Sequence, residues 1–587
     1  MQLSVPSLKK PDNNAFDSHA THLNTWIDNL PMANVGEATR QLYLALADMN
    51  SQKLPDTQRL QALEILTPSI NYVTESLKKH FVGQGLPLTE KQHKVARLTR
   101  ELTHELATGY KILVVEQQDG DKPFKDKKLF VKSIYHALRL LGSVLLKCYQ
   151  TYTTYPRNVW SEIHTLYHYA ETHKLHEVSI LNNNESHTIS DKYKQILLLA
   201  LACPYRMRHG VVEKVYTALN EWALHCRLTA LEYNTEALFV TTMDCDQPPT
   251  YLVLRNSNSN PETTRILETE AISEDVRQAL TNLRKAGQSK YQLSANTLRR
   301  LMLAWGVMPK RRFSRTRDHA QIVAATGLCA IHYFVSGESV FNQPSHGIVV
   351  NELGPEGVAA YHSSESDDNR GGTPEMWEMK YRLEGEARPS STEEAVAIAA
   401  SGMRINRAYE TQAWKMVNVS AGGYCLLWDN QETTRAQVGE LVGIREQSDP
   451  DTFHWRLGVI RWLKMVEKRG LELGIQMLSP SAIAVTAKPD TTRRIKDNQS
   501  RGLLVPEITS IQQSATLLLP SPPYSIDDTV VIDCNGKEVK VRLTKLVENT
   551  GSFAQFQFVS LGAVHRPITA PAEAPKLGEF DDIWDIL

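Results

Sequence analysis

The stretch AWKMVNVSAGGYCLLW, residues 413–428, contains two apolar runs that are typical of β-strands, joined by a short polar turn. The turn carries Asn418, Ser420, Gly422 and Gly423 in the pattern N-x-S-x-x-G. Gly423 permits a positive φ angle or a close approach by another backbone. The amide groups and short polar side chains of such a turn can meet a ligand, although an ordinary hairpin turn has the same pattern.

A dense basic cluster, KRRFSRTR at residues 310–317, precedes the first strand-like run of this half of the chain. Arg311 and Arg315 are four residues apart, so both reach one ligand if the segment curls against a barrel. A guanidinium fork forms paired hydrogen bonds with a phosphate group or with the O6/N7 edge of guanine. The alternative interpretations of the cluster alone are a solvated basic linker and a non-specific nucleic-acid patch.

Taken together, the two motifs resemble those of the PilZ domain family and occur in the family's order. The runs VGELVGIRE, WRLGVIRWL and LELGIQML also resemble the family's closing strands, so the resemblance covers about residues 309–490. It implies a six-stranded β-barrel that binds the bacterial second messenger cyclic di-GMP through guanine-edge and phosphate contacts. The ligand-binding residues that it implies are Arg311, Arg315, Asn418, Ser420 and Gly423, with Lys310, Arg312, Arg317 and Gly422 as additional candidates.

Two features depart from the family's pattern. About a hundred residues separate the motifs, where a compact PilZ domain has a few tens, so we interpret the polar stretch at about 336–408 as an insertion between strands. Asn418 stands where aspartate is commoner in the family, and both side chains can accept a hydrogen bond from guanine.

The rest of the chain predicts a multidomain α+β protein with an all-α N-terminal half. Apolar residues recur at three- and four-residue intervals between residues 17 and 225, which favours six to eight antiparallel helices in a bundle or solenoid. The predicted domains are a helical region at 1–225, a small mixed α/β connecting region at 226–308, the PilZ-like barrel at 309–490, a second β-rich domain or degenerate barrel at 500–562, and a linker with a tail at 563–587.

The composition narrows the class of protein. Sixty-five Lys and Arg residues stand against 66 Asp and Glu, so an anion site must come from a local group of basic residues. The seven cysteines include no C-x-x-C motif, which favours a reducing compartment. We find no signal-peptide pattern, and the longest apolar run, at 196–203, is shorter than the ~20 residues of a spanning helix. We therefore expect a cytoplasmic protein without a membrane span, and recruitment to a membrane-associated machine stays open.

Neither catalysis nor metal binding has support in the motifs. The sequence contains no G-x-S-x-G, no G-x-x-x-x-G-K-[ST] and no G-x-G-x-x-G motif, so we predict no enzyme activity and no cofactor. His164 and His168 share one helical face, but H-E-x-x-H is absent and aromatic residues surround the pair. We therefore interpret them as ordinary surface or half-buried histidines and predict no metal site.

The final residues, EFDDIWDIL, form an acidic amphipathic pattern after a linker rich in proline and alanine. Four apolar side chains fall at i, i+3, i+4 and i+7, the spacing of a helix that docks in a groove; they are Phe580, Ile583, Trp584 and Leu587. This pattern predicts a tethered peptide that docks on a partner. The alternative is that the tail packs on its own protein.

The sequence thus favours a non-enzymatic cyclic di-GMP effector that controls a protein partner. The resemblance suggests partners in motility, type IV pilus or secretion machinery, with outputs that include surface attachment and exopolysaccharide. One alternative is a helical scaffold or co-chaperone whose barrel has lost its ligand. The other is an RNA-binding protein that uses the basic cluster at 310–317, although nucleic acid is the less favoured ligand.

Overall fold

The computed structural model describes most of the chain. The described residues are 3–12, 15–118, 124–182, 185–231, 237–255, 259–287, 290–308, 313–337, 409–446, 454–490, 499–508, 513–534 and 536–563. The stretch at 338–408, which holds most of the predicted insertion, and the tail at 564–587 lie outside them. The chain divides into two compact units: 1–318 with 417–438 and 460–475, and 319–416 with 439–459 and 476–587.

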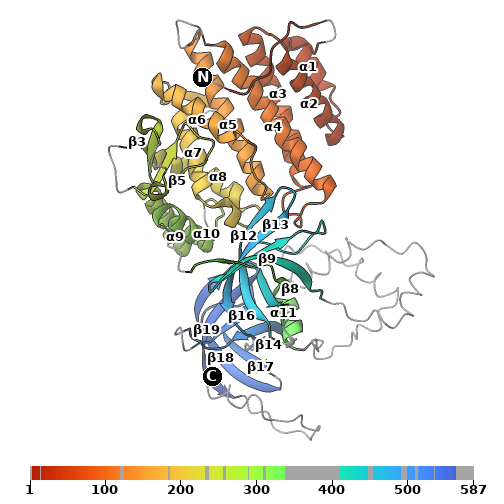
Figure 1. Cartoon of the computed structure of the whole chain (residues 1–587), viewed down its shortest axis with the longest axis vertical. Helices are drawn as coiled ribbons and strands as arrows, with labels where there is room; N and C mark the ends of the chain where they lie inside the picture. The colour runs from red at the N-terminus through yellow and green to blue at the C-terminus, as the bar shows by residue number, and fades with distance from the viewer. Residues whose placement is uncertain are drawn as a thin grey trace, which may run out of the picture. The chain divides into compact units, whose positions relative to one another are not determined.

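The N-terminal region is helical, as predicted, and its longest helices run side by side (Figure 1). Side-chain caps fix several helix starts: Thr89 and Gln92 form a reciprocal capping box, and Asp126 accepts from two backbone amides. The described helices are α1 (Ala20–Asp28), α2 (Val35–Ser51), α3 (Asp56–Lys78), α4 (Glu90–Glu116), α5 (Lys127–Gln150), α6 (Val159–Thr172), α7 (Ile189–Leu201) and α8 (Val211–Trp222). A short hairpin, β1 (Ile180–Asn182) with β2 (Glu185–His187), lies between α6 and α7.

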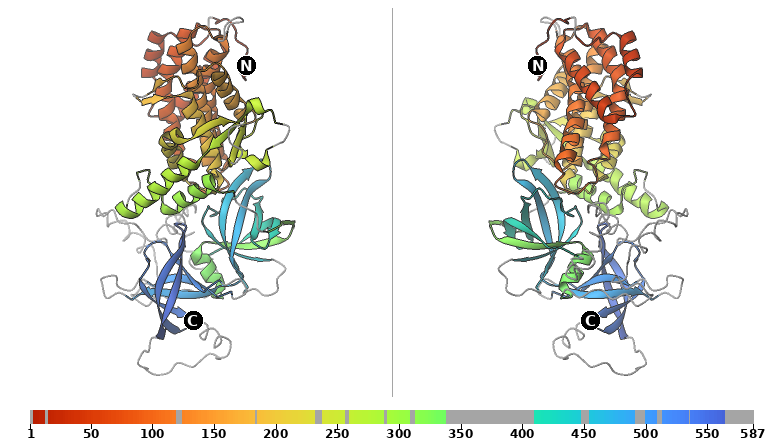
Figure 2. Two further views of the ribbon diagram at one scale, coloured as in Figure 1. Left: turned by 90° about the vertical axis from the view of Figure 1, so that its left-hand side faces the viewer. Right: turned by 90° about the vertical axis from the view of Figure 1, so that its right-hand side faces the viewer.

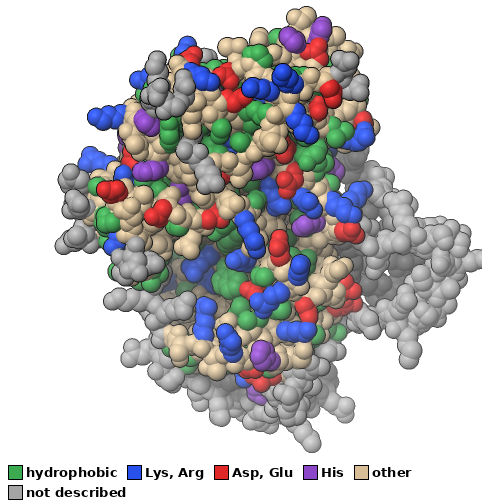
Figure 3. All heavy atoms as spheres, turned by 45° about the horizontal axis from the view of Figure 1, so that its top comes forward, with side chains coloured by type: hydrophobic (Ala, Val, Ile, Leu, Met, Phe, Trp, Pro, Cys, Tyr) green, Lys and Arg blue, Asp and Glu red, His purple; other side chains and the backbone are tan. Residues whose placement is uncertain are grey.

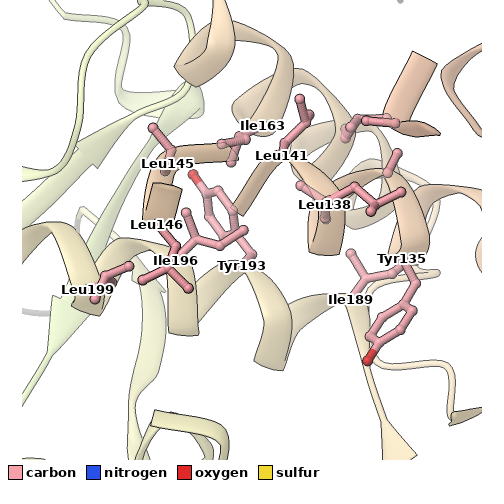
Figure 4. Packing of buried hydrophobic residues seen from close by; sticks show 14 of the residues in the cluster. Tyr135, Leu138, Leu141, Leu145, Leu146, Ile163, Ile189, Tyr193, Ile196 and Leu199 are labelled. Atoms are coloured by element: carbon pink, nitrogen blue, oxygen red, sulfur yellow. The ribbon is translucent and has the colours of Figure 1, made fainter. Parts of the chain in front are cut away.

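Helix α5 is the centre of the helical core. Its buried residues Leu138 and Leu141 lie near Tyr193 and Ile196 of α7 in the packed interior shown in Figure 4. Of the helices that the structure describes, α5 is the one that is long and apolar enough to cross a membrane. However, 78% of its most apolar stretch is buried inside the protein, as expected of a core helix.

A buried ion pair crosses this core. Lys111 of α4 and Glu162 of α6 are joined by contacts of 2.9 and 3.0 Å, and their side chains are 0% and 7% exposed. The same carboxylate accepts a hydrogen bond from the backbone amide of Ser4 at 2.9 Å. The pair therefore ties two helices and the N-terminal segment together at a site with little access to solvent.

A mixed α/β region follows the helices. Its four-stranded sheet has the order β3-β6-β4-β5, and its two helices pack against each other (Figure 2). Trp305 donates from its indole nitrogen to the Leu198 carbonyl at 3.2 Å, so the region shares the core of the helical part. The elements are β3 (Arg227–Ala230), β4 (Phe239–Thr242), β5 (Thr250–Tyr251), β6 (Thr264–Glu268), α9 (Glu270–Ala286) and α10 (Ala295–Gly306).

The first barrel is a closed ring of six strands, which confirms the predicted barrel. Its order is β10-β13-β12-β11-β8-β9, closed by pairing of β9 with β10, and the short strand β7 extends it beside β9 (Figure 1). The strands are β7 (Thr316–Arg317), β8 (Gln321–Thr326), β9 (Gln412–Ser420), β10 (Gly423–Trp428), β11 (Leu441–Glu446), β12 (Arg456–Val466) and β13 (Gly470–Ser479).

One run of this barrel differs from the expected strand. We expected the whole of AQIVAATGLCAIHYFV to be β-rich, but after β8 the residues Leu328–Val335 form helix α11. The buried positions include Leu328, Ile331 and His332, which have helical spacing. A short apolar run is compatible with both a strand and a buried helix, so the tertiary environment decides between them.

A second closed barrel has the order β14-β15-β16-β19-β18-β17. Its first strand, β14, lies in the stretch that we had assigned to the PilZ-like region ending at 490, and the barrel therefore begins before residue 500. The hairpin predicted at CNGKE joins β17 and β18 by pairing of Cys534 with Lys537. The strands are β14 (Ile483–Pro489), β15 (Ser500–Val505), β16 (Thr516–Pro520), β17 (Thr529–Cys534), β18 (Lys537–Asn549) and β19 (Phe553–Ala563).

Within the first unit, the described ends of the first barrel contact the helical region. The backbone amide of Met465 on β12 donates to the Tyr152 carbonyl at 2.8 Å. The amide of Thr434, between β10 and β11, donates to the Leu86 carbonyl at 2.6 Å. Strands of the barrel are thus joined to the helical loops by backbone hydrogen bonds.

We predict that Glu162→Gln strongly destabilises the helical region, because the substitution leaves the Lys111 ammonium buried without a counter-charge. Loss of one partner of a buried pair costs about 3–5 kcal/mol. Urea unfolding followed by far-UV circular dichroism should show an earlier helical transition. The control is Glu177→Gln, whose side chain is 63% exposed. Equal midpoints for the two variants would contradict the prediction.

Candidate functional site

The end of the basic cluster lies along the polar turn of the first barrel. Strand β7 pairs antiparallel with β9, with Thr316 opposite Val419 and Arg317 opposite Asn418. The ring of Phe313 also covers Gly422, where an added Cβ atom would lie 2.9 Å from the ring. The structure therefore brings 313–317 and 418–423 together, although about a hundred residues separate them in the sequence.

The turn has the conformation that its glycine predicts. Gly423 has a φ angle of +152°, a value that favours glycine, and the Ser420 hydroxyl donates to its carbonyl at 3.3 Å. Asn418, Ser420 and Gly422 are half-buried, whereas Gly423 is buried. The serine thus fixes the turn internally, while the residues before it border the surface.

Two of the predicted basic residues lie beside this turn. The side chains of Arg315 and Arg317 are exposed, and neither forms a hydrogen bond or an ion pair with another residue that the structure describes. A guanidinium group without a protein counter-charge is available to an anion. The other predicted basic residues, Lys310, Arg311 and Arg312, lie outside the described residues.

A buried thiol lies beneath these groups. Cys425 of β10 is 6% exposed and forms a side-chain hydrogen bond with Asn418. Burial and the nearby Glu472 carboxylate raise the pKa of the thiol to about 11, and Arg315 and Arg469 act in the opposite direction. The thiol is therefore a buried, protonated group at neutral pH, and it contacts Asn418 beside the turn.

The sequence motifs missed two residues that contact the site: Phe313, which packs on Gly422, and Cys425, which is hydrogen-bonded to Asn418. Phe313 lies inside the basic cluster, and an aromatic residue between arginines is a signal that could have identified it. Cys425 lies in the quoted stretch but reads as an ordinary apolar strand residue.

The expectation of surface or half-buried histidines on α6 is wrong for His164, which is fully buried in the core, whereas the side chain of His168 is 39% exposed. His164 is buried, and its ring nitrogens are hydrogen-bonded to the Tyr193 hydroxyl at 2.7 Å and to the Gln247 carbonyl at 2.8 Å. Burial lowers the pKa of His164 to about 4. Among the residues that the structure describes, no group of three or more His, Cys, Asp and Glu side chains is placed to hold a metal ion.

Charges are mixed over the face of the molecule drawn in Figure 3, where basic and acidic side chains are interspersed. This agrees with the near-zero net charge of the chain. Binding of an anion therefore depends on the local placement of arginines and not on a broad positive field. The predicted docking residues of the tail, Phe580, Ile583, Trp584 and Leu587, lie outside the described residues.

Comparison with known families covers most of the chain. Residues 21–233 match the N-terminal domain of the cyclic-di-GMP receptor FimW, residues 238–483 match its middle PilZ domain, and residues 485–561 match its C-terminal beta-barrel domain. The cyclic-di-GMP receptor FimW of Pseudomonas aeruginosa is 30% identical over 617 residues, covering 100% of this chain and 99% of the relative. No solved structure matches the chain.

We predict that the Cys425 thiol is nearly inert to iodoacetamide in the folded protein at pH 8. With a pKa of about 11, about one thiol in a thousand is ionised at that pH, and the thiolate is the nucleophile. Mass spectrometry of peptides after timed alkylation measures the rate. The control is the same reaction in urea, where Cys425 should react like the other cysteines. Equal rates with and without urea would contradict the prediction.

Proposed function

Since the chain belongs to the family of FimW cyclic-di-GMP receptors, we propose that its first barrel binds cyclic di-GMP. The observation that carries the proposal is the pairing of β7 with β9, because it lays the arginine-bearing segment against the N-x-S-x-x-G turn. The receptor family also supports an effector that does not act as an enzyme.

The chemistry of the ligand suits these residues. Cyclic di-GMP carries two phosphate charges and two guanine bases on a compact ring. In our proposal, Arg311 and Arg315 form charge-assisted hydrogen bonds with phosphates and guanine edges. Asn418 and Ser420 contact the other guanine face, and Gly423 maintains the turn. Lys310, Arg312 and Arg317 are auxiliary phosphate contacts, and Gly422 leaves the space that the ring of Phe313 occupies.

The ligand thus lies between two segments that are distant in sequence. The arginine segment follows α10, and the turn belongs to β9 and β10 of the barrel. A ligand that contacts both segments stabilises their association, because its binding free energy includes the contacts that hold them together. Ligand binding at the barrel is thereby linked to the connection with the helical region.

We propose that the effector passes this signal to a protein partner. The acidic amphipathic tail with Phe580, Ile583, Trp584 and Leu587 is the proposed docking peptide. The partners that fit the PilZ resemblance are components of motility, type IV pilus or secretion machinery, with control of surface attachment or exopolysaccharide. The proposed location is the cytoplasm, with recruitment to such a membrane-associated machine.

The two alternatives differ in measurable ways. A scaffold or co-chaperone with a degenerate barrel binds no cyclic di-GMP. The exposed Arg315 beside the turn, which has no ion-pair partner among the described residues, disfavours this alternative. An RNA-binding protein prefers RNA to cyclic di-GMP, and its affinity falls steeply with salt because cations are released from the phosphate backbone. Titrations with both ligands at two salt concentrations separate these alternatives.

We predict that Arg315→Ala and Arg311→Ala each weaken cyclic di-GMP binding about 5- to 150-fold in isothermal titration calorimetry. The loss of a bidentate contact costs about 1–3 kcal/mol, which sets this range. GTP and cyclic di-AMP are the ligand controls. Arg277→Ala on α9 is the protein control, because that arginine is 64% exposed and pairs with Glu274. Unchanged affinity in both site variants would refute the proposed site.

For the tail, we predict that deletion of residues 578–587 leaves cyclic di-GMP affinity unchanged and abolishes capture of the partner. The reason is that the deletion removes the apolar stripe but no barrel residue. Pull-down from the native organism with full-length and shortened proteins tests this. The point variant Trp584→Ala should lose capture as well. Identical sets of captured proteins would exclude the docking role.

A further inference from the structure

We propose that the helical region has an anion site of its own, in which Arg139 of α5, Lys192 of α7 and the Tyr216 hydroxyl of α8 hold a phosphate group. None of the three residues is among those proposed to bind cyclic di-GMP, and all three belong to the described part of the chain. The inference therefore does not depend on the proposed function of the barrel.

Helix α5 places Arg139 between the other two groups. Tyr135, Arg139 and Gly142 fall at i, i+4 and i+7, so they form one row along the helix. The Lys192 ammonium lies over the Tyr135 ring, 6.0 Å from its centroid. A Cβ atom added at Gly142 would lie 2.9 Å from the Tyr216 hydroxyl oxygen. Lys192 and Tyr216 thus lie at the two ends of the row, and Arg139 begins between them.

A buried glutamine fixes Lys192 relative to α8. Lys192 Nζ donates to Gln195 Oε1 at 2.5 Å, and Gln195 Nε2 donates to the Tyr216 carbonyl at 2.7 Å. The lysine is 8% exposed and the glutamine is 2% exposed, so this link has little access to solvent. An ammonium group has three N–H donors, of which Gln195 accepts one. Donors of Lys192 therefore remain for an anion.

Two buried donors beside Lys192 lack a partner. The Arg139 Nε–H group and the Tyr216 hydroxyl have no hydrogen-bond partner among the residues that the structure describes. Within the same residues, Arg139 also has no ion pair. Buried polar groups are nearly always hydrogen-bonded, because the loss of solvation without a partner is costly. A bound oxyanion would satisfy both donors.

The positive charges of Arg139 and Lys192 reinforce each other. Burial and the nearby Arg139 charge lower the pKa of Lys192 to about 8, and the charge of Arg139 also acts on Tyr216, which agrees with its position between them. Carboxylates in this part of the helical region have lysine partners of their own: Asp191 pairs with Lys194, Glu213 with Lys78 and Glu64 with Lys132. An anion between the two cations would remove their repulsion.

The set of donors suits a phosphate group. A guanidinium fork bonds to two phosphate oxygens, and an ammonium and a hydroxyl can each bond to another oxygen. Burial raises the pKa of the Tyr216 hydroxyl, which keeps it protonated as a donor. A phosphate monoester presents three terminal oxygens, whereas a carboxylate presents two in one plane. Donors from three helices are therefore served more completely by phosphate.

The test is thermal unfolding of the full-length protein, followed by far-UV circular dichroism, in about 0.1–20 mM inorganic phosphate at constant ionic strength. Phosphate should raise the Tm of the wild type in a saturable way, because a ligand of the folded state stabilises it. Arg139→Met and Lys192→Met should each weaken the apparent affinity about tenfold or more. Tyr216→Phe, which removes only an unpartnered hydroxyl, should weaken it as well and disturbs the fold least.

The matched control is Lys94→Met, which removes a positive charge that is 74% exposed and pairs with Glu90. Its response to phosphate should equal that of the wild type, since any general effect of the salt acts on both proteins. Without phosphate, Arg139→Met should melt no earlier than the wild type, because the substitution removes one of two neighbouring like charges. A structural arginine would instead lower the Tm when replaced.

Glycerol 3-phosphate and acetate identify the class of anion. Stronger stabilisation by glycerol 3-phosphate than by inorganic phosphate assigns the site to a phosphate ester, and equal or weaker stabilisation assigns it to the free ion. Equal stabilisation by acetate overturns the assignment to phosphate. The inference is also overturned if phosphate stabilises the wild type no more than chloride does, or if the three site variants respond like Lys94→Met.

Discussion

The antiparallel pairing of β7 with β9 is the constraint on which the rest of the proposed site depends. It places Arg317 opposite Asn418 and so carries Arg315 toward the turn. A strand of two residues contributes few ladder hydrogen bonds, and the packing of Phe313 on Gly422 adds apolar contact to them. Without this pairing, the basic cluster would be a charged connection with no fixed relation to the barrel.

The closed barrel fixes the relative positions of the strands that carry the site. Because β10 pairs with β9, the buried Cys425 thiol lies against Asn418 and supports the polar turn from beneath. The same barrel contacts the helical region, through the Met465 amide on β12 and the Thr434 amide after β10. The site and the contacts with the helices are therefore parts of one compact unit.

The sequence predicted the order of the helical region and the barrels better than it predicted which segments are strands and to which barrel each strand belongs. Helical periodicity identified the N-terminal helices, and the order of motifs and strands identified the first barrel, because these signals are local. Leu328–Val335 was predicted as strand but forms helix α11, since a short buried apolar run fits both structures. Strand β14 was assigned to the first barrel but closes the second by pairing with β15 and β17. The partner of a strand is not specified by the periodicity of that strand alone.

By itself, the sequence determined the chemical types at the site: guanidinium groups at a fixed spacing, a short amide and hydroxyl, and a glycine where the backbone requires a positive φ angle. These properties belong to the residues and their immediate neighbours. Only the tertiary structure decided that the segment carrying Arg315 lies beside the turn and that Phe313 covers Gly422. Those relations arise from hydrogen-bonded pairing between distant strands, which no local pattern specifies.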